Sequence, residues 1–392
     1  MMDYNKFLSP GVTSIKKSGI RKFFDIADQM KDILNLTVGE PDFVTPRHIR
    51  EEAIESVKKG QTHYGSNNGI LELREEIDKY LKRRFDLSYD PKSEIVVTVG
   101  VSEAIDLALR SVLSPGDEAI IPLPAFVCYA PLVSLTGASP VVIHTKMKDN
   151  FKLMPEDLKA AITPKTKLLI LPFPNNPTGA VMEKHELEKI AQIAKEADIL
   201  VLSDEVYAEL SYGFKHTSIA GLPDMRERTI LVNGFSKAFA MTGWRLGYAC
   251  APEPILAQMA KIHQYAIMCA PRMSQAAGLK AMRDGDEDIE YMRADYDGRR
   301  KVIYNGLKQI GMDCFEPKGA FYVFPSIEKF GLSSYDFCER LLYEEKVAIV
   351  PGGAFGEQGE GFARICYAYS VANINKALEK VDKFIKKLAP KP

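Results

Sequence analysis

Long apolar runs and clusters of one charge are both missing from this chain of 392 residues. No stretch approaches the roughly 20 apolar residues that a membrane-spanning helix needs, and no apolar segment of signal-peptide length follows the first residues. Lysine and arginine number 51 and aspartate and glutamate 52, which leaves a net charge of −1. A nucleic-acid tail and a polybasic membrane anchor are therefore not expected, and the sequence predicts a cytoplasmic protein that handles small molecules.

Paired cysteines and metal-binding histidine patterns are missing as well. The six cysteines are scattered, and none forms a CxxC pair. This spacing predicts reduced thiols rather than a disulfide framework or a zinc site. The six histidines show no ligand spacing, and no Ser/His/Asp order is legible, so we expect neither a metal centre nor a catalytic histidine.

The apolar residues that are present fall into short runs. The chain is longer than one hydrophobic core usually supports, so two domains or one domain with a lobe are expected. Helix-length amphipathic stretches, such as Ser102–Leu113 and Glu186–Ala197, separate most of the runs. This alternation predicts an α/β fold with a mostly parallel seven-stranded sheet flanked by helices. The predicted strands are Ile95–Val99, Ala119–Leu123, Val141–His144, Leu168–Leu171, Ile199–Leu202, Ile230–Val232 and Leu246–Ala251.

The pattern changes after about residue 285. A charged helical stretch over 289–307 is followed by short predicted strands around 312–315 and 320–325. A helix near 335–345 and a final helix from Asn373 complete this part. We therefore expect a large domain over 46–285 and a small α+β domain over 286–392.

Four chemically informative residues follow predicted strands by one to five positions. They are Gly100, Asn176, Asp204 and Lys237. In α/β sheets, ligands bind outside the carboxyl ends of the strands, so one crevice is expected to hold all four.

Lys237 is the most informative of these residues, because a lysine among small residues after an apolar run can form a Schiff base. The segments Asn175–Gly179, Asp204–Tyr207 and Asn233–Gly247 together supply an asparagine, an aspartate, a tyrosine, a lysine and an arginine. That set fits pyridoxal phosphate. The amine holds the aldehyde, a carboxylate keeps the pyridine nitrogen protonated, and an arginine grips the phosphate.

The order and spacing of these segments resemble the class I and II aminotransferases, which are pyridoxal-phosphate enzymes of fold type I. The likeness runs from about residue 20 to 378, and it includes Gly39–Phe43, His63–Gly65 and Arg364. It implies that the segment 1–45 joins the small domain, which moves over the substrate. It also implies a homodimer, in which Tyr64 reaches the neighbour's phosphate.

The resemblance assigns a role to each matching position. Gly100, Val101, Ser102, Ser236 and Arg245 would hold the phosphate, and Phe126 would stack on the ring. Asn176 and Tyr207 would donate to the phenolic oxygen, Asp204 would face the ring nitrogen, and Lys237 would move the proton. Gly39, Asn176 and Arg364 would bind the substrate carboxylate.

Several of these residues have ordinary structural alternatives. Taken alone, Gly100–Ser102 is typical of a strand-to-helix turn with Ser102 as N-cap, Phe126 of a core residue, and Tyr64 of a packing tyrosine. Val101 and Cys366 depart slightly from the family pattern, in which a small or polar residue and a serine are common.

The expected reaction is a transamination in two half-reactions, with glutamate and 2-oxoglutarate as the common pair. The first alternative function is a β- or γ-lyase acting on sulfur amino acids, which would use the same scaffold. The second is a regulator without catalytic activity. The blocks 18–23, 63–65, 124–127 and 319–325 resemble aromatic, aspartate and N-acetyl-diaminopimelate aminotransferases alike. Arg272 is a candidate for binding a distal carboxylate of the substrate. The alternative is that it is an ordinary surface arginine.

Overall fold

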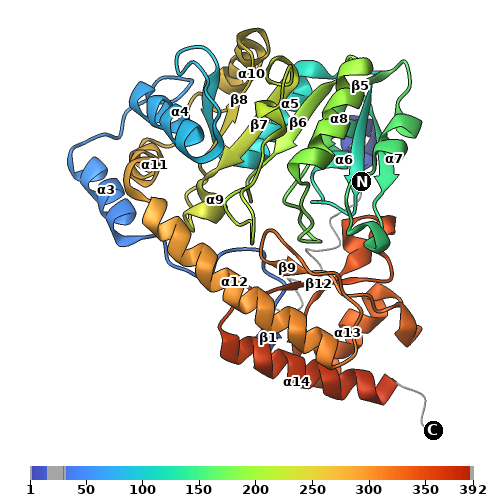
Figure 1. The fold of residues 1–392 in the computed structure, drawn as a ribbon. Coiled ribbons are helices and arrows are strands. Elements are labelled where there is room, and N and C mark those ends of the chain that lie inside the picture. Colours follow the sequence, from blue (N-terminus) through green and yellow to red (C-terminus); the bar gives the residue numbers. More distant parts are fainter. Residues whose placement is uncertain (1, 16–29, 31, 389–392) are drawn as a thin grey trace.

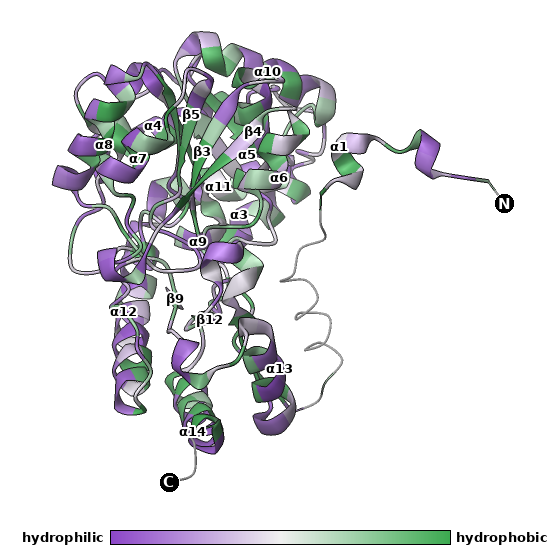
Figure 2. Cartoon of the chain, turned by 90° about the vertical axis from the view of Figure 1, so that its right-hand side faces the viewer, coloured by the Kyte–Doolittle hydropathy of each residue, from purple (hydrophilic) through white to green (hydrophobic). Residues whose placement is uncertain are grey.

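The computed structural model describes residues 2–15, 30 and 32–388, and Figure 1 shows how their elements are arranged. The sequence block 18–23 lies outside the described residues. The first elements are a 3-10 turn at Asn5–Phe7 and the short helix α1 (Pro10–Thr13). Figure 2 shows α1 beside the helix α6 (Tyr129–Leu135), whereas the 3-10 turn extends away from the main body of the chain.

All seven predicted strands form, and they make a single sheet. Its spatial order is β2 (Ile95–Thr98), β8 (Gly247–Cys250), β7 (Thr229–Gly234), β6 (Leu200–Asp204), β5 (Thr166–Leu171), β3 (Glu118–Leu123) and β4 (Ser139–His144). Strand β8 runs antiparallel to both of its neighbours, and every other pair is parallel. The prediction of a mostly parallel α/β sheet is confirmed.

Helices cover both faces of this sheet (Figure 1). Successive strand residues point to opposite faces, so each strand supplies two hydrophobic clusters. Leu169 of β5 packs in the same cluster as Ile190 of α8 (Lys184–Glu196), whereas Ile170 packs with Ile105 of α5 (Val101–Val112). The other helices of this part are α3 (Arg47–Lys58), α4 (Leu71–Phe85), α6 (Tyr129–Leu135), α7 (Pro155–Ala161), α9 (Phe235–Ala238), α10 (Glu253–Ala266) and α11 (Arg272–Asp284).

A second group of elements lies below the large sheet in Figure 1. Its helices are α12 (Asp286–Gln309), α13 (Ser334–Glu345) and α14 (Val371–Leu388), and all three were expected from the sequence. They surround a small antiparallel sheet in the order β11 (Val350–Pro351), β12 (Ala363–Cys366) and β9 (Tyr322–Val323). Buried residues of α14 recur at helical spacing, which anchors this helix to the small core: Ile374, Ala377, Leu378, Val381, Phe384 and Ile385.

The predicted strand around 312–315 is wrong. Asp313 accepts a backbone hydrogen bond from Ser326 at 2.8 Å, but the segment forms no continuous ladder with a neighbouring strand. A strand needs paired backbone groups along its length, and Pro317 removes a donor just beyond the segment. The strand expected over 320–325 is confirmed only for its centre, Tyr322–Val323.

The N-terminal part of the described chain contacts this second group through β1 (Leu34–Asn35). This strand pairs in parallel with β10 (Val347–Ala348), more than 300 positions away in the sequence. This pairing places β1 beside the second group of elements, and the division into domains, including the assignment of residues 1–45, stays a prediction.

A substitution at Gly247 tests how closely β8 packs against the turn between β2 and α5. A Cβ added at Gly247 would lie 2.7 Å from the carbonyl carbon of Gly100 and from the nitrogen of Val101, which are backbone atoms. We expect Gly247→Ala to lower the free energy of unfolding by roughly 2–3 kcal/mol through overpacking. Urea unfolding measures this change. Gly243→Ala is the matched control, because nothing lies within 4 Å of its added Cβ, and equal losses in the two variants would contradict the prediction.

Candidate functional site

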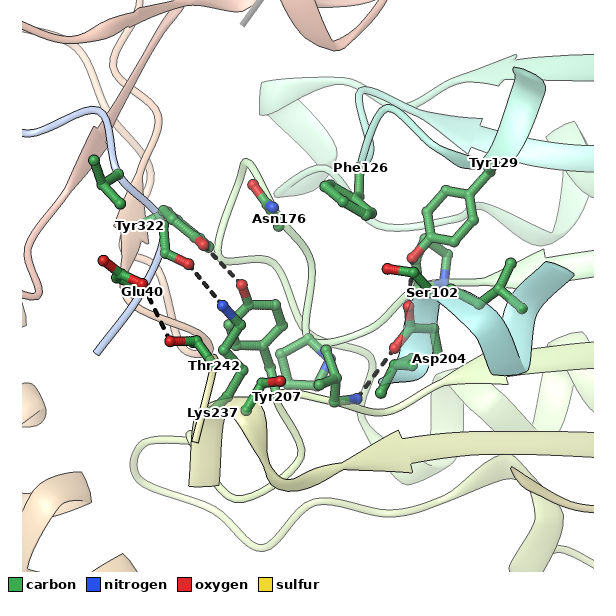
Figure 3. Close-up of a pocket in the computed structure, with 18 of the residues that line it drawn as sticks. Glu40, Ser102, Phe126, Tyr129, Asn176, Asp204, Tyr207, Lys237, Thr242 and Tyr322 are labelled. Atoms are coloured by element: carbon green, nitrogen blue, oxygen red, sulfur yellow. Dashed lines mark hydrogen bonds between the residues drawn. The ribbon is translucent and has the colours of Figure 1, made fainter. Parts of the chain in front are cut away.

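The carboxyl ends of β2, β3, β5, β6 and β7 meet at one edge of the large sheet, because these strands share one direction. A cavity of about 350 Å³ opens at this edge (Figure 3). Most of the residues singled out from the sequence line it: Gly39, Val101, Ser102, Phe126, Asn176, Asp204, Tyr207, Ser236, Lys237, Arg245 and Arg364. The structure therefore brings segments from seven places in the chain to one crevice.

Gly100 forms the turn that leads from β2 into α5. Its φ of 78° lies in the left-handed region that favours glycine, and a Cβ there would lie 2.5 Å from an Nη atom of Arg245. Ser102 is the second residue of α5 and not its N-cap, which is Gly100. The free N–H groups of this helix end, Ser102, Ser236 and Arg245 form a cradle suited to an anion.

Asn176 reaches the cavity from a turn that its neighbour Asn175 holds in place. The Asn175 Oδ1 accepts hydrogen bonds from the backbone N–H of Thr178 at 3.1 Å and from its hydroxyl at 2.8 Å. Gly179 closes the turn with a φ of 73°. Because Asn175 makes these local bonds, the side chain of Asn176 is available to the cavity, where its Oδ1 accepts from Arg364 at 2.9 Å.

Asp204 is the last residue of β6 and is buried. Burial raises the pKa of its carboxyl to about 6, although hydrogen bonds from Tyr129 and from the backbone of Val206 favour the charged form. The Tyr129 hydroxyl donates to Oδ2 at 2.7 Å (Figure 3). A cation bound next to this carboxylate would offset the cost of burying its charge.

Lys237 lies in α9, directly after β7, and its amine faces the cavity (Figure 3). Its Nζ donates to the carbonyl oxygen of Gly39 at 2.6 Å. Burial lowers the pKa of this amine to about 8 from an ordinary value of 10.5. A larger fraction of the amine is therefore neutral, and so nucleophilic, near neutral pH than in an exposed lysine.

Arg364 enters the cavity from β12, on the side opposite Asp204. The arginine is buried, and its guanidinium donates to Asn176 and to the carbonyl oxygen of Thr37. Its Nε is buried without a partner in the described structure, and the two neighbouring nitrogens are held in place by hydrogen bonds. This arrangement suits the binding of a planar carboxylate.

Three of the residues expected at the site, Gly100, Tyr64 and Arg272, do not line this cavity, although Gly100 forms the turn next to Val101, which does. The side chain of Tyr64 is 83% exposed, so its predicted contribution to a neighbouring subunit stays a prediction. Arg272, the first residue of α11, packs its Cδ 3.0 Å from where a Cβ of Gly65 would lie. Its role in reading a distal carboxylate also stays a prediction.

Sequence reasoning missed two tyrosines at the cavity, Tyr129 and Tyr322. Tyr129 is the first residue of α6 and follows Phe126 by three positions in the segment after β3, so the nearness of a second aromatic residue is a signal that could have found it. Tyr322 comes from β9, and no local pattern links that strand to the sheet edge.

Within residues 2–15, 30 and 32–388, no group of three or more histidine, cysteine, aspartate or glutamate side chains is arranged to hold a metal ion. The same residues contain no helix that is both long enough and apolar enough to cross a membrane.

The depressed pKa of Lys237 has a measurable consequence. In protein without a bound ligand, we expect reductive methylation of Lys237 to rise with a midpoint near pH 8, because the neutral amine reacts and burial disfavours the charged form. Mass spectrometry at a series of pH values measures the labelling. The exposed lysines serve as internal controls with ordinary midpoints about 2 pH units higher, and a shared midpoint would contradict the prediction.

Comparison with known proteins places the chain in a family. The family model "Aminotransferase class I and II" matches residues 31–381. The protein YugH of Bacillus subtilis (strain 168) is 52% identical over 97% of this chain and 99% of its own length. An aspartate aminotransferase of Pyrococcus abyssi (strain GE5 / Orsay) is 47% identical over 97% and 98%.

More distant relatives carry other substrate names. A probable N-acetyl-LL-diaminopimelate aminotransferase of Bacillus subtilis (strain 168) is 43% identical over 97% of this chain and 96% of its own. The crystal structure of an aromatic aminotransferase from Pyrococcus horikoshii OT3 superposes with a TM-score of 0.89 at 45% identity, covering 94% of this chain and 99% of that one. Sequence and fold agree along nearly the whole chain, which belongs to the class I and II aminotransferase family.

Proposed function

We propose that this aminotransferase uses pyridoxal phosphate, held in the cavity at the sheet edge, to move an amino group from an amino acid to a 2-oxo acid. The observation that carries the proposal is the placement of three charged groups in one cavity. A buried amine of lowered pKa lines the same cavity as a buried carboxylate and a buried arginine whose Nε has no partner among the described residues. The family is generally dependent on this cofactor and acts on amino acids and 2-oxo acids.

The lining residues fit each polar group of the cofactor. The cradle of the α5 N-terminus, Ser102, Ser236 and Arg245 suits the phosphate. Asp204 suits a protonated ring nitrogen, because this cation would stabilise a carboxylate that burial otherwise drives toward the neutral form. Phe126 offers an aromatic face at the same cavity.

Bound pyridoxal phosphate supplies an aldehyde that condenses with amines and a ring that draws electrons away from the substrate Cα. Lys237 is the amine that we expect to hold the aldehyde at rest. Facing a bound substrate, the Lys237 amine would accept the proton of Cα and return it. Its lowered pKa makes the neutral amine, the form that accepts a proton, easier to reach than in an exposed lysine.

Arg364 and Asn176 form the expected site for the α-carboxylate that amino acids and 2-oxo acids share. The Nε of the guanidinium has no hydrogen-bond partner in the described structure, and the contacts of the other two nitrogens with Asn176 and Thr37 fix its plane. A fixed plane reduces the entropy lost when the carboxylate binds. Both half-reactions then use one carboxylate site, which suits a ping-pong sequence.

The role of Arg364 can be tested with Arg364→Lys. We expect KM for glutamate to rise roughly ten- to hundred-fold with a smaller change in kcat, because lysine keeps the charge but loses the planar pair of donors. Steady-state kinetics with 2-oxoglutarate as acceptor measure both constants. An unchanged visible spectrum of the bound cofactor is the control for folding, and an unchanged KM would remove Arg364 from the carboxylate site.

The amino donor is proposed to be of the aspartate or aromatic type, with glutamate and 2-oxoglutarate as the common pair. Relatives named for aspartate, aromatic amino acids and N-acetyl-LL-diaminopimelate support this range. Lys237, Arg245 and Arg364 are the basic side chains of the cavity lining, and the other lining residues in reach of a substrate include apolar Val38 and aromatic Tyr322.

The decisive test of the function is a panel of half-reactions. The purified protein is expected to carry a yellow absorbance band, and a single amino acid should bleach it by converting the cofactor to its amine form. Bleaching by aspartate and glutamate indicates an acidic donor, and bleaching by tyrosine or phenylalanine an aromatic one. Release of pyruvate and ammonia without bleaching would replace the proposal with a lyase, and the absence of a band would overturn the cofactor assignment.

A further inference from the structure

Tyr322 occupies the space between two residues of the proposed site, Tyr207 and Arg364. Its hydroxyl lies 2.7 Å from the hydroxyl of Tyr207, in a buried contact drawn in Figure 3. Its ring lies under the guanidinium of Arg364, whose Cζ is 4.6 Å from the ring centroid. The two contacts use different parts of one side chain, which makes Tyr322 the physical link between them.

The position of Tyr322 is tightly fixed. The side chain is 1% exposed, and β9 pairs with β12 so that Tyr322 lies opposite Cys366, two residues beyond Arg364. A side chain at position 39 would collide with the Tyr322 hydroxyl, so Gly39 leaves room for it. Phe355 covers the guanidinium of Arg364 from a second ring, at 5.0 Å.

Simple packing does not account for the hydroxyl. A phenylalanine would fill nearly the same volume, whereas a buried hydroxyl is costly unless it is hydrogen-bonded. The partner here is the hydroxyl of Tyr207, a cavity residue, rather than a backbone group of the core. Within the described residues, the hydroxyl of Tyr322 is thus satisfied by its hydrogen bond with Tyr207, a residue of the proposed site.

Either hydroxyl of the pair can be the donor in the bond between them. Burial raises the pKa of both Tyr207 and Tyr322, so each keeps its proton near neutral pH. One proton forms the bond between them, and the other is free to be donated elsewhere. The cation of Arg364 beside its ring makes Tyr322 the better donor, which leaves the proton of Tyr207 for a ligand in the cavity.

We propose that Tyr322 is a positioning residue that directs the Tyr207 hydroxyl toward the cofactor's phenolic oxygen and braces Arg364 for the substrate carboxylate. The inference rests on the proposed function. It connects the two ends of the reaction site, because a carboxylate that neutralises Arg364 also changes how strongly Tyr322 donates to Tyr207.

Two variants separate the two tasks. Tyr322→Phe removes the hydroxyl and keeps the ring under Arg364, whereas Tyr322→Leu removes both. Tyr367→Phe is the matched control, since Tyr367 is equally buried and donates its hydroxyl to the carbonyl oxygen of Ala320 at 3.0 Å, away from Tyr207 and Arg364. Each holoenzyme is titrated with pH while the absorbance of the bound cofactor is followed, and KM and kcat for glutamate are measured.

A hydrogen bond to the phenolic oxygen stabilises its negative charge and lowers the pH midpoint of the absorbance change. We expect Tyr322→Phe to raise that midpoint by about 1 pH unit, the size of one such bond, with KM within about two-fold of the wild type. Tyr322→Leu should raise the midpoint similarly and also raise KM roughly ten-fold, through the lost ring contact. Tyr367→Phe should change neither quantity.

Three results would overturn the inference or its basis. An unchanged midpoint in Tyr322→Phe would show that the hydroxyl does not direct Tyr207. Equal KM values in the Phe and Leu variants would show that the ring does not brace Arg364, and the Phe variant alone still decides the first point if the Leu variant does not fold. A wild-type protein without a cofactor band would instead overturn the proposed function itself.

Discussion

The shared direction of β2, β3, β5, β6 and β7 is the constraint on which the rest of the site depends. Each of these strands is followed by a turn at the same edge of the sheet, so residues far apart in the sequence meet there. Apolar packing on both faces fixes the strands, and the loops at the edge are left to carry polar side chains. The position of the cavity therefore follows from the strand topology and does not depend on which residues line it.

Burial then sets the chemistry of the groups placed at that edge. The same low-polarity surroundings lower the pKa of the Lys237 amine and raise that of the Asp204 carboxyl. Both shifts oppose charge in the ligand-free protein, and a ligand with a cationic nitrogen near Asp204 would reverse the second one. Tyr129, which donates to Asp204, already favours the charged carboxylate. The site is thus arranged to be completed by a charged ligand.

The second group of elements contributes the opposite wall. Strand β12 brings Arg364 and β9 brings Tyr322, and both side chains meet residues of the large sheet's loops. The pairing of β1 with β10 places the N-terminal segment beside this wall, and Gly39 follows β1 into the cavity. A substrate in the cavity would therefore contact the large sheet and the small one together, which is the arrangement that a closing domain requires.

The sequence by itself determined the seven strands and most of the cavity residues. Short buried apolar runs are a local signal, and Asn176, Asp204 and Lys237 follow such runs by two to five positions, so their meeting at one edge needed only the rule for parallel sheets. The resemblance of these motifs to a known family supplied the chemistry that spacing alone left open.

Only the tertiary structure decided which distant side chains touch. Tyr322 meets Tyr207 across 115 positions and Tyr129 meets Asp204 across 75, and no local period encodes such contacts. The reversed direction of β8 and the absence of a strand around 312–315 likewise depend on which backbone groups find partners. Local patterns fix where an element can form, whereas pairing and side-chain contact are settled by the packing of the whole chain.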